Sequence, residues 1–391
     1  MTENLARQVT EADELSAMVI EQADRLFRGE VTKERMAQAD RGEWPAAISE
    51  AIERAGLALA LVPEGQGGVG LPPVDALRLI RRSGYYTLPL PLAETMIAAA
   101  LWSQVSGATV AGTMSLAPSR VTDAIGIARS AGGYVLQGRA QRIPWGAQVD
   151  HVLIYARDAT GSGYLALLPR GAALAQPHRN LANEPRDTLV LDAIAVPPAA
   201  VRPAPPACVE GLITFGALVR AHQMVGAMER CLDYAVAYAM DRQQFGRPIG
   251  KFQAVQHMLA DAAGQYAAAA AAAELAAEAY GNTDFAFAVA IAKARVGEAA
   301  GKVAEVCHQV HGAMGFTQEH PLHFATRRLW SWRDEFGHET FWQERIGRLV
   351  CSAGGEALWP MLVGNEDELV SAGSGSAPNP NTSERQKGTQ P

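Results

Sequence analysis

The sequence predicts a mainly α-helical protein with a central β domain, and three observations along the chain carry this prediction. Residues 1–110 place apolar side chains three to four positions apart on a charged background, as in Ala12–Leu26, which is typical of amphipathic helices. Residues 111–206 switch to short apolar runs bounded by Gly, Asp and Ser, which indicate strands of a barrel or sandwich. Residues 207–355 return to long alanine-rich patterns, so we expect a C-terminal four-helix bundle.

Segments rich in glycine and proline separate these regions. Pro63–Gly70 is a turn-rich link within the N-terminal helical domain, and a further helix is expected to begin near Pro73. In the β domain the clearest strand signals are the runs at 134–136, 151–155 and 164–168. A cluster of prolines then marks the boundary to the last helices: Pro203, Pro205 and Pro206.

The C-terminal pattern predicts four long helices followed by a tail. We expect the helices at 209–242, 251–280 and 284–311, with a final one ending near Val350. Beyond them Gly, Ser, Asn, Pro and Gln come to dominate, a composition that buries too little apolar surface to fold. Residues 356–391 are therefore predicted to be a disordered tail.

Composition excludes several classes of protein. The 391 residues are 48% hydrophobic and carry a net charge of −7, which argues against a nucleic-acid partner, since such proteins usually carry a basic face. No run of about 18 apolar residues occurs, so no membrane span is expected. The start of the chain lacks the features of a secretory signal. Four cysteines without CxxC spacing fit a reducing cytoplasm: Cys208, Cys231, Cys307 and Cys351.

Two motif-like patterns are better explained as ordinary structure. Gly65–Gly70 matches GxGxxG, but Pro72 and Pro73 follow at once, and a dinucleotide fingerprint needs a strand before it and a helix at its last glycine. The histidine pairs His308/His311 and His320/His323 could suggest a metal. Gly312 and Pro321 interrupt the chain between them, so four converging ligands are not expected, and we predict no metal site.

The most informative stretch is Asp241–Gln253, a short turn between two predicted helices. It carries Arg242, two amides and the ring of Phe245; an arginine fork suits a pyrophosphate, and a ring suits a flat heterocycle. Taken alone it could equally be a polar helix–helix connection. A second block, Gln309–Phe316, is rich in glycine, which lets the backbone approach a phosphate at a helix end.

In order, spacing and helical context the two blocks resemble the C-terminal half of the acyl-CoA dehydrogenase family, and the three-part architecture resembles it over about residues 10–355. The resemblance implies FAD as the cofactor and α,β-desaturation of an acyl-CoA thioester as the reaction. It implies that Arg242 contacts the FAD pyrophosphate and Gln244 and Phe245 the adenosine half, with Gln253 on the following turn. The adenine diphosphate end would meet a second set: Gln309, Gly312 and Gly315. Because these blocks generally serve a flavin held by a neighbouring subunit, we expect a dimer or tetramer, with an electron-transfer flavoprotein or a similar acceptor.

The catalytic base is where the chain departs from the family, which typically carries its glutamate in a Tyr-Glu-Gly-Thr segment. An ungapped alignment from Gln309 puts Phe336 at the position of the base, and the alternative position used by some members corresponds to Gly216. Glu335, one residue before Phe336, is the first candidate, and Glu339 is the alternative. The third possibility is that this chain carries no base.

The middle domain departs as well. Members usually place an indole and a hydroxyl beside the flavin ring, where this chain has Arg142 and Pro144. The half that reaches a partner's flavin thus looks complete, while the half that holds its own does not. This asymmetry resembles acyl-CoA dehydrogenases built from two unlike chains, so the second hypothesis is a non-catalytic, FAD-sharing structural subunit. A third interpretation is a relative that uses flavin with oxygen on a substrate other than a CoA thioester.

Overall fold

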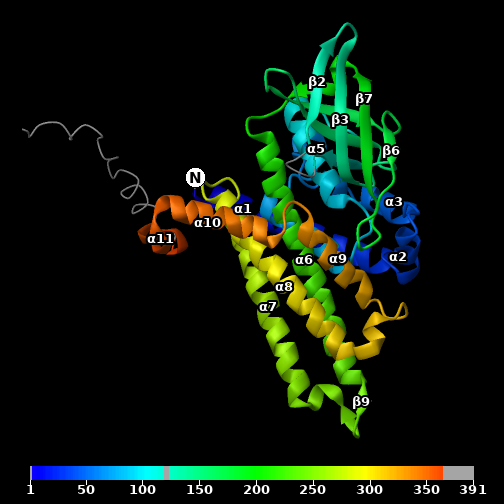
Figure 1. Cartoon of the computed structure of the whole chain (residues 1–391), viewed down its shortest axis with the longest axis vertical. Helices are drawn as coiled ribbons and strands as arrows, with labels where there is room; N and C mark the ends of the chain where they lie inside the picture. Colours follow the sequence, from blue (N-terminus) through cyan, green and yellow to red (C-terminus); the bar gives the residue numbers. More distant parts are fainter. Residues whose placement is uncertain (1, 119–122, 364–391) are drawn as a thin grey trace, which may run out of the picture. The chain divides into compact units, whose positions relative to one another are not determined.

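The computed structural model of the chain describes residues 2–118 and 123–363 (Figure 1). Residues up to 342 form one compact unit, and the residues from 343 onward belong to a second, so each unit is described by itself. The sequence-predicted architecture, mainly α with a central β domain, is confirmed.

The N-terminal part is built from helices that end where the sequence changes character. The helices are α1 (Thr2–Glu30), α2 (Lys33–Asp40), α3 (Ala46–Arg54), α4 (Pro73–Tyr85) and α5 (Leu92–Ser106), with the short 3₁₀ helices η1 (Leu57–Leu59) and η2 (Glu64–Gln66) between α3 and α4. Thr32 caps α2, since its hydroxyl accepts a hydrogen bond from the backbone N–H of Arg35. Gly107 ends α5 with a left-handed φ of 73°, which glycine adopts readily.

The central domain is a β structure whose two halves enclose one core. Its strands are β1 (Met114–Ala117), β2 (Ile125–Ser130), β3 (Gly133–Pro144), β4 (His151–Arg157), β5 (Gly163–Pro169), β6 (Leu174–Gln176), β7 (Arg186–Val196) and β8 (Val201–Pro203). Strands pair in the order β6-β7-β3-β2-β4-β5-β8, with β1 parallel to β4. Buried residues of both halves, such as Leu136 and Ile154, share one hydrophobic cluster, as in a sandwich.

The C-terminal helices form the bundle, with one correction to the sequence prediction. They are α6 (Cys208–Asp241), α7 (Gln253–Glu278), α8 (Phe285–His311) and α9 (Leu322–Asp334), together with the short strands β9 (Gln243–Gln244) and β10 (Arg247–Pro248) and the 3₁₀ helices η4 (Ile249–Lys251) and η5 (Gly312–Phe316). The next helix, α10 (Glu339–Ala353), runs into the second unit. The single last helix expected to end near Val350 is therefore two helices. Phe336 and Gly337 break it, with φ angles of 56° and 98°, which a continuous helix does not allow.

The start of the predicted tail is also corrected. Residues 355–363 are helical, as η6 (Gly355–Ala357) and α11 (Leu358–Val363), because Leu358–Val363 is mostly apolar. The rest of that prediction, from residue 364, lies outside the described residues. Among the helices of the described chain, none has the length and apolar character needed to cross a membrane.

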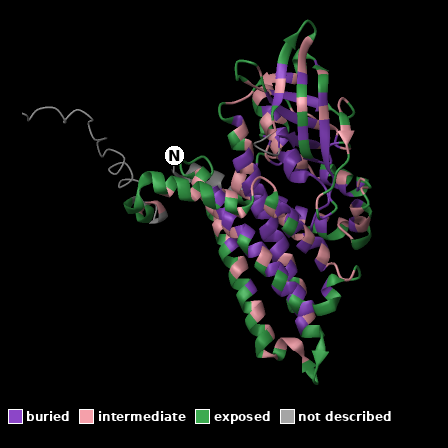
Figure 2. Cartoon of the chain, in the orientation of Figure 1, coloured by how far each residue is buried: buried purple, intermediate pink, exposed green. Residues whose placement is uncertain are grey.

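Buried residues gather along α6 and α8, whereas α7 is largely exposed (Figure 2). Helices α4 and α6 cross in close backbone contact at Gly84 and Gly226. A Cβ on Gly226 would overlap the carbonyl oxygen of Arg81, and a Cβ on Gly84 would overlap that of Gln223. Only residues without a side chain fit this crossing.

Gly226→Ala is therefore expected to lower the free energy of unfolding by about 2–3 kcal/mol, in the range for overpacking a core. Gly264→Ala on exposed α7 is the matched control, because nothing lies within 4 Å of its Cβ position, and it should gain about 0.5–1 kcal/mol from helix propensity. Urea unfolding of both variants measures the difference, and equal midpoints for the two would contradict this account of the crossing.

Candidate functional site

The first predicted cofactor block is an exposed hairpin after α6. Strands β9 and β10 pair across a turn at Phe245 and Gly246, whose φ angles are 52° and 76°. The Phe245 side chain is 91% exposed, and Arg242 and Gln244 are exposed as well. Within the described residues the Arg242 guanidinium has no ion-pair partner, so it is available to an anion that comes from outside the chain.

Contacts at its base hold this hairpin in one conformation. The backbone N–H of Ile249 donates to the carbonyl of Arg242 over 2.8 Å. The rings of Phe245 and Phe252 meet edge to face with centroids 6.1 Å apart, and the Arg247 guanidinium lies 4.2 Å from the Phe252 centroid. Gln253, the first residue of α7, is exposed beside this turn.

The second block follows α8 directly. Gly312 turns the chain with φ 58° and ψ −139°, a backbone conformation that suits glycine. Gln309 and Gly312 are exposed. Gly315 is buried, and a Cβ there would come within 3.1 Å of the His308 ring, so this glycine packs the turn against α8 and presents little surface.

The structure brings the two blocks to the same end of the bundle. Tyr238, in the last turn of α6, stacks on His311, the last residue of α8, with ring centroids 4.7 Å apart and an interplanar angle of 27°. These two residues, 73 positions apart in the sequence, are thus neighbours. Among the described residues, no group of three His, Cys, Asp or Glu side chains is placed to hold a metal ion.

Glu335, the first candidate for the base, is held by two arginines. Its carboxylate accepts a hydrogen bond from Nε of Arg186 over 2.8 Å and from Nε of Arg220 over 2.7 Å. Burial by itself would raise the pKa of Glu335, but the charges and hydrogen bonds of Arg186 and Arg220 outweigh it and lower the pKa to about 2. The carboxylate is therefore ionised and fully engaged at neutral pH.

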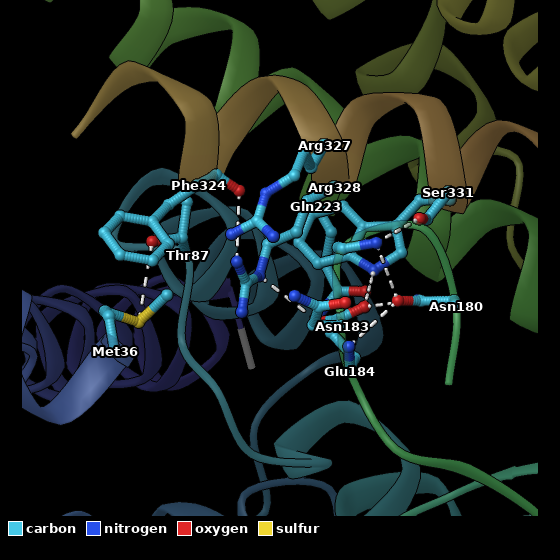
Figure 3. Close-up of polar contacts among 12 residues, drawn as sticks. Met36, Thr87, Asn180, Asn183, Glu184, Gln223, Phe324, Arg327, Arg328 and Ser331 are labelled. Atoms are coloured by element: carbon cyan, nitrogen blue, oxygen red, sulfur yellow. Dashed lines mark hydrogen bonds and ion pairs between the residues drawn. The ribbon is translucent and has the colours of Figure 1, made fainter. Parts of the chain in front are cut away.

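These ion pairs belong to a larger buried network of three arginines and three glutamates. Arg220 also pairs with Glu94 of α5, and Glu184 pairs with Arg186 over 2.9 Å and with Arg328 over 3.2 Å. Figure 3 shows the side of the network where Glu184 meets Arg328, with Asn180 beside it. The opposite charges balance, as burial requires.

The network fills the space between the β domain and the helices. The gap that Pro144 and Trp145 share with Arg186, Arg220 and Trp332 is a cavity of only about 10 Å³, roughly the room that one water molecule needs. By the sequence resemblance, the flavin ring of a complete family member would lie beside residues 142–145. A cavity of this size does not hold a flavin ring.

The two positions that the family uses for its base lie against each other. A Cβ on Gly216 would overlap the ring of Phe336, so this ring occupies the place of a side chain there. Lys293 holds the turn, since its Nζ donates to the carbonyls of Arg333 and Gly337, each over 2.7 Å. Burial lowers the pKa of Lys293 to about 7.

Glu339, the alternative candidate, is the first residue of α10 and lies outside the ion-pair network of Glu335. It forms an ion pair with Arg333, and its second oxygen lies against Gly297 of α8. The catalytic roles of Glu335 and Glu339 stay predictions, and the ion pairs of both carboxylates weigh against them.

Comparison with known proteins finds similar sequences among acyl-CoA dehydrogenases. Residues 207–333 match the family model described as the acyl-CoA dehydrogenase C-terminal domain. The chain is 28% identical over 290 residues to the acyl-CoA dehydrogenase IpdE2 of Mycobacterium tuberculosis, which covers 74% of this chain and 82% of the relative. It is 29% identical to IpdE2 of Mycolicibacterium smegmatis, over 71% of this chain and 78% of that one.

Solved structures share the fold. The ChsE4-ChsE5 complex of Mycobacterium tuberculosis matches with a TM-score of 0.77 at 24% identity, covering 86% of this chain and 96% of that one. A glutaryl-coenzyme A dehydrogenase bound to glutaryl-CoA matches with a TM-score of 0.76 at 21% identity, covering 85% and 94%. The fold is that of the flavin-dependent acyl-CoA dehydrogenases.

Over most of its length the chain is thus similar to acyl-CoA dehydrogenases, and residues 207–333 match the C-terminal domain of that family. Its cofactor is accordingly FAD, its function class is the α,β-desaturation of an acyl-CoA thioester, and similar structures include assemblies of more than one chain. Some residues of this chain suit FAD binding and others do not. Arg242, which is exposed and has no ion-pair partner among the described residues, fits a diphosphate that approaches from outside the chain, whereas the small cavity beside Pro144 does not fit a flavin ring.

Proposed function

We propose that this chain is the FAD-sharing subunit of an acyl-CoA dehydrogenase made of two unlike chains, and that the catalytic base belongs to the partner chain. One observation carries the proposal: the Phe336 ring stands over Gly216, so neither position at which the family keeps its base holds an ionisable group. The match to a complex of two differently named proteins, ChsE4 and ChsE5, agrees with it in fold.

The chemistry explains why this observation matters. Removal of the proton next to the thioester carbonyl needs a carboxylate that is ionised but basic enough to accept it. A phenyl ring cannot do this. Glu335 would have to leave two arginines, and a pKa of about 2 makes it a weak base at neutral pH.

This chain would instead contribute binding. The Arg242 guanidinium can donate two parallel hydrogen bonds to a diphosphate, and the exposed Phe245 ring offers a face to a heterocycle. The turn at Gly312 brings backbone close to the same ligand. When bound, FAD supplies the acceptor for the hydride that leaves the β-carbon. An electron-transfer flavoprotein or a similar carrier would then take up the electrons.

Other sequence predictions stay part of this proposal. The division into domains at 1–110, 111–206 and 207–355 follows the changes of element type after α5 and after β8. A reducing cytoplasm suits the free thiols of the described cysteines, three of which are buried. A dimer or a tetramer of the two chains would provide the shared flavin.

Turnover of an acyl-CoA in the flavin-loaded assembly tests where the base lies. Glu339→Gln in this chain is expected to leave turnover within about twofold of the parent, because the base is elsewhere. A loss of tenfold or more, the least that general-base catalysis usually contributes, would assign the base to this chain. Thr340→Ser serves as the neighbouring control for damage to the start of α10.

A further inference from the structure

We propose that Tyr238, His311 and His320 form a positioning cluster that fixes the spacing between the Arg242 hairpin and the Gly312 turn, and so the affinity of the shared FAD diphosphate. The inference rests on the proposed function and adds to it residues that touch no cofactor themselves. It starts from the way the last turns of α6 and α8 meet.

Tyr238 and His311 each stand directly behind one cofactor-contacting block. The carbonyl of Tyr238 accepts a hydrogen bond of 2.8 Å from the backbone N–H of Arg242. His311 is the residue before Gly312, and its Nδ1 lies 2.7 Å from the carbonyl oxygen of Cys307 in the preceding turn. Because their rings stack at 4.7 Å, a shift of either helix end changes the distance between the blocks.

His320 closes the cluster from the loop before α9. Its ring centroid lies 4.4 Å from that of His311 and 6.4 Å from that of Tyr238. It also meets the ring of Tyr234 edge to face, at 5.5 Å. Nδ1 of His320 accepts a hydrogen bond from the backbone N–H of Leu322, so the loop that carries this ring is fixed to the start of α9.

We infer that the cluster acts through the stacking of its rings, which holds the ends of α6 and α8 together. His311 is 2% exposed, and Tyr238 is only half-buried. Helix ends are the parts of a bundle that fray most readily, and an aromatic pair there adds a contact of defined direction. The prediction is that the flat rings matter and that the Tyr238 hydroxyl does not.

The test compares variants that keep or remove the ring at position 238. FAD affinity and dissociation rate are measured on the flavin-loaded oligomer as purified, together with the unfolding midpoint. Tyr238→Phe keeps the ring and should match the parent within twofold. Tyr238→Leu removes it and should release FAD at least fivefold faster, with the unfolding midpoint kept because the side chain is half-exposed.

A second pair at position 311 guards against a variant that fails to fold. His311→Phe keeps a ring and should stay within threefold of the parent, whereas His311→Leu should lose FAD as Tyr238→Leu does. The inference is overturned if the leucine variants fold and hold FAD as tightly as the parent, or if the phenylalanine variants lose it equally. Arg242→Ala separates the two proposals: if it loses FAD while Tyr238→Leu does not, only the positioning cluster fails.

Discussion

Replacing Glu335 with glutamine is expected to lower the free energy of unfolding by about 3–5 kcal/mol, the usual effect of removing one partner from a buried ion pair. The variant leaves Arg186 and Arg220 facing each other with one counter-charge fewer. Both guanidinium groups are buried, at 7% and 3% exposed, and Glu335 itself is 13% exposed. Solvent therefore cannot replace the lost charge.

The stabilisation by Glu335 also depends on pH in a defined direction. The folded-state pKa of Glu335 is lowered to about 2 from an ordinary value of 4.5. Its contribution to stability is therefore fully present above pH 4.5 and is lost as the pH falls from about 4.5 to about 2. The difference in unfolding free energy between parent and Glu335→Gln should shrink across that window.

Urea unfolding at pH 7 and at several values down to pH 3 measures both effects. Glu305→Gln is the matched control, because its carboxylate is 70% exposed and pairs with Lys302 on the surface; it should change stability by less than about 0.5 kcal/mol. If Glu335→Gln proved as mild as Glu305→Gln, the buried ion-pair network would not contribute the stability assigned to it.

Arg242→Ala is expected to weaken FAD binding by about 2–4 kcal/mol, because a charge-assisted contact to the diphosphate is lost. That corresponds to roughly 30-fold to 900-fold in the dissociation constant. Folding should be kept, since the side chain is exposed and its backbone, not its guanidinium, holds the hairpin.

Titration of FAD into the flavin-depleted oligomer measures this loss. Arg54→Ala on α3 is the control, as an exposed arginine far in sequence from both blocks. An Arg242→Ala variant that binds FAD as tightly as the Arg54→Ala variant would remove the cofactor assignment of the hairpin, and with it the proposed function.

The order of helical, β and helical regions was predictable because each has its own hydrophobic period. The break between α9 and α10 was not, since it depends on Phe336 in a left-handed conformation that Lys293 stabilises from α8. The helical start of the predicted tail was missed as well. Its apolar run at Leu358–Val363 is short, and the polar residues after it dominate the composition.

The candidate site also has parts that the sequence predicts and parts that it does not. The hairpin and the Gly312 turn are local in sequence, so both could be found from their residues. The buried ion-pair network could not be predicted, because Glu94, Arg186, Arg220 and Glu335 come from four distant parts of the chain. Arg220 alone gave a signal: it is a charged residue within the apolar run of α6 at 217–221, where a buried charge needs a partner.

The most direct test of the central claim is the number of FAD molecules per chain, measured on the protein purified alone and purified together with a partner chain. The exposed Arg242 hairpin and the small cavity beside Pro144 predict substantially no FAD on the chain alone, and one FAD for each pair of unlike chains. One FAD per chain in a homo-oligomer of this protein would contradict the account, because a flavin ring would then have to lie beside Pro144, where the cavity is only about 10 Å³.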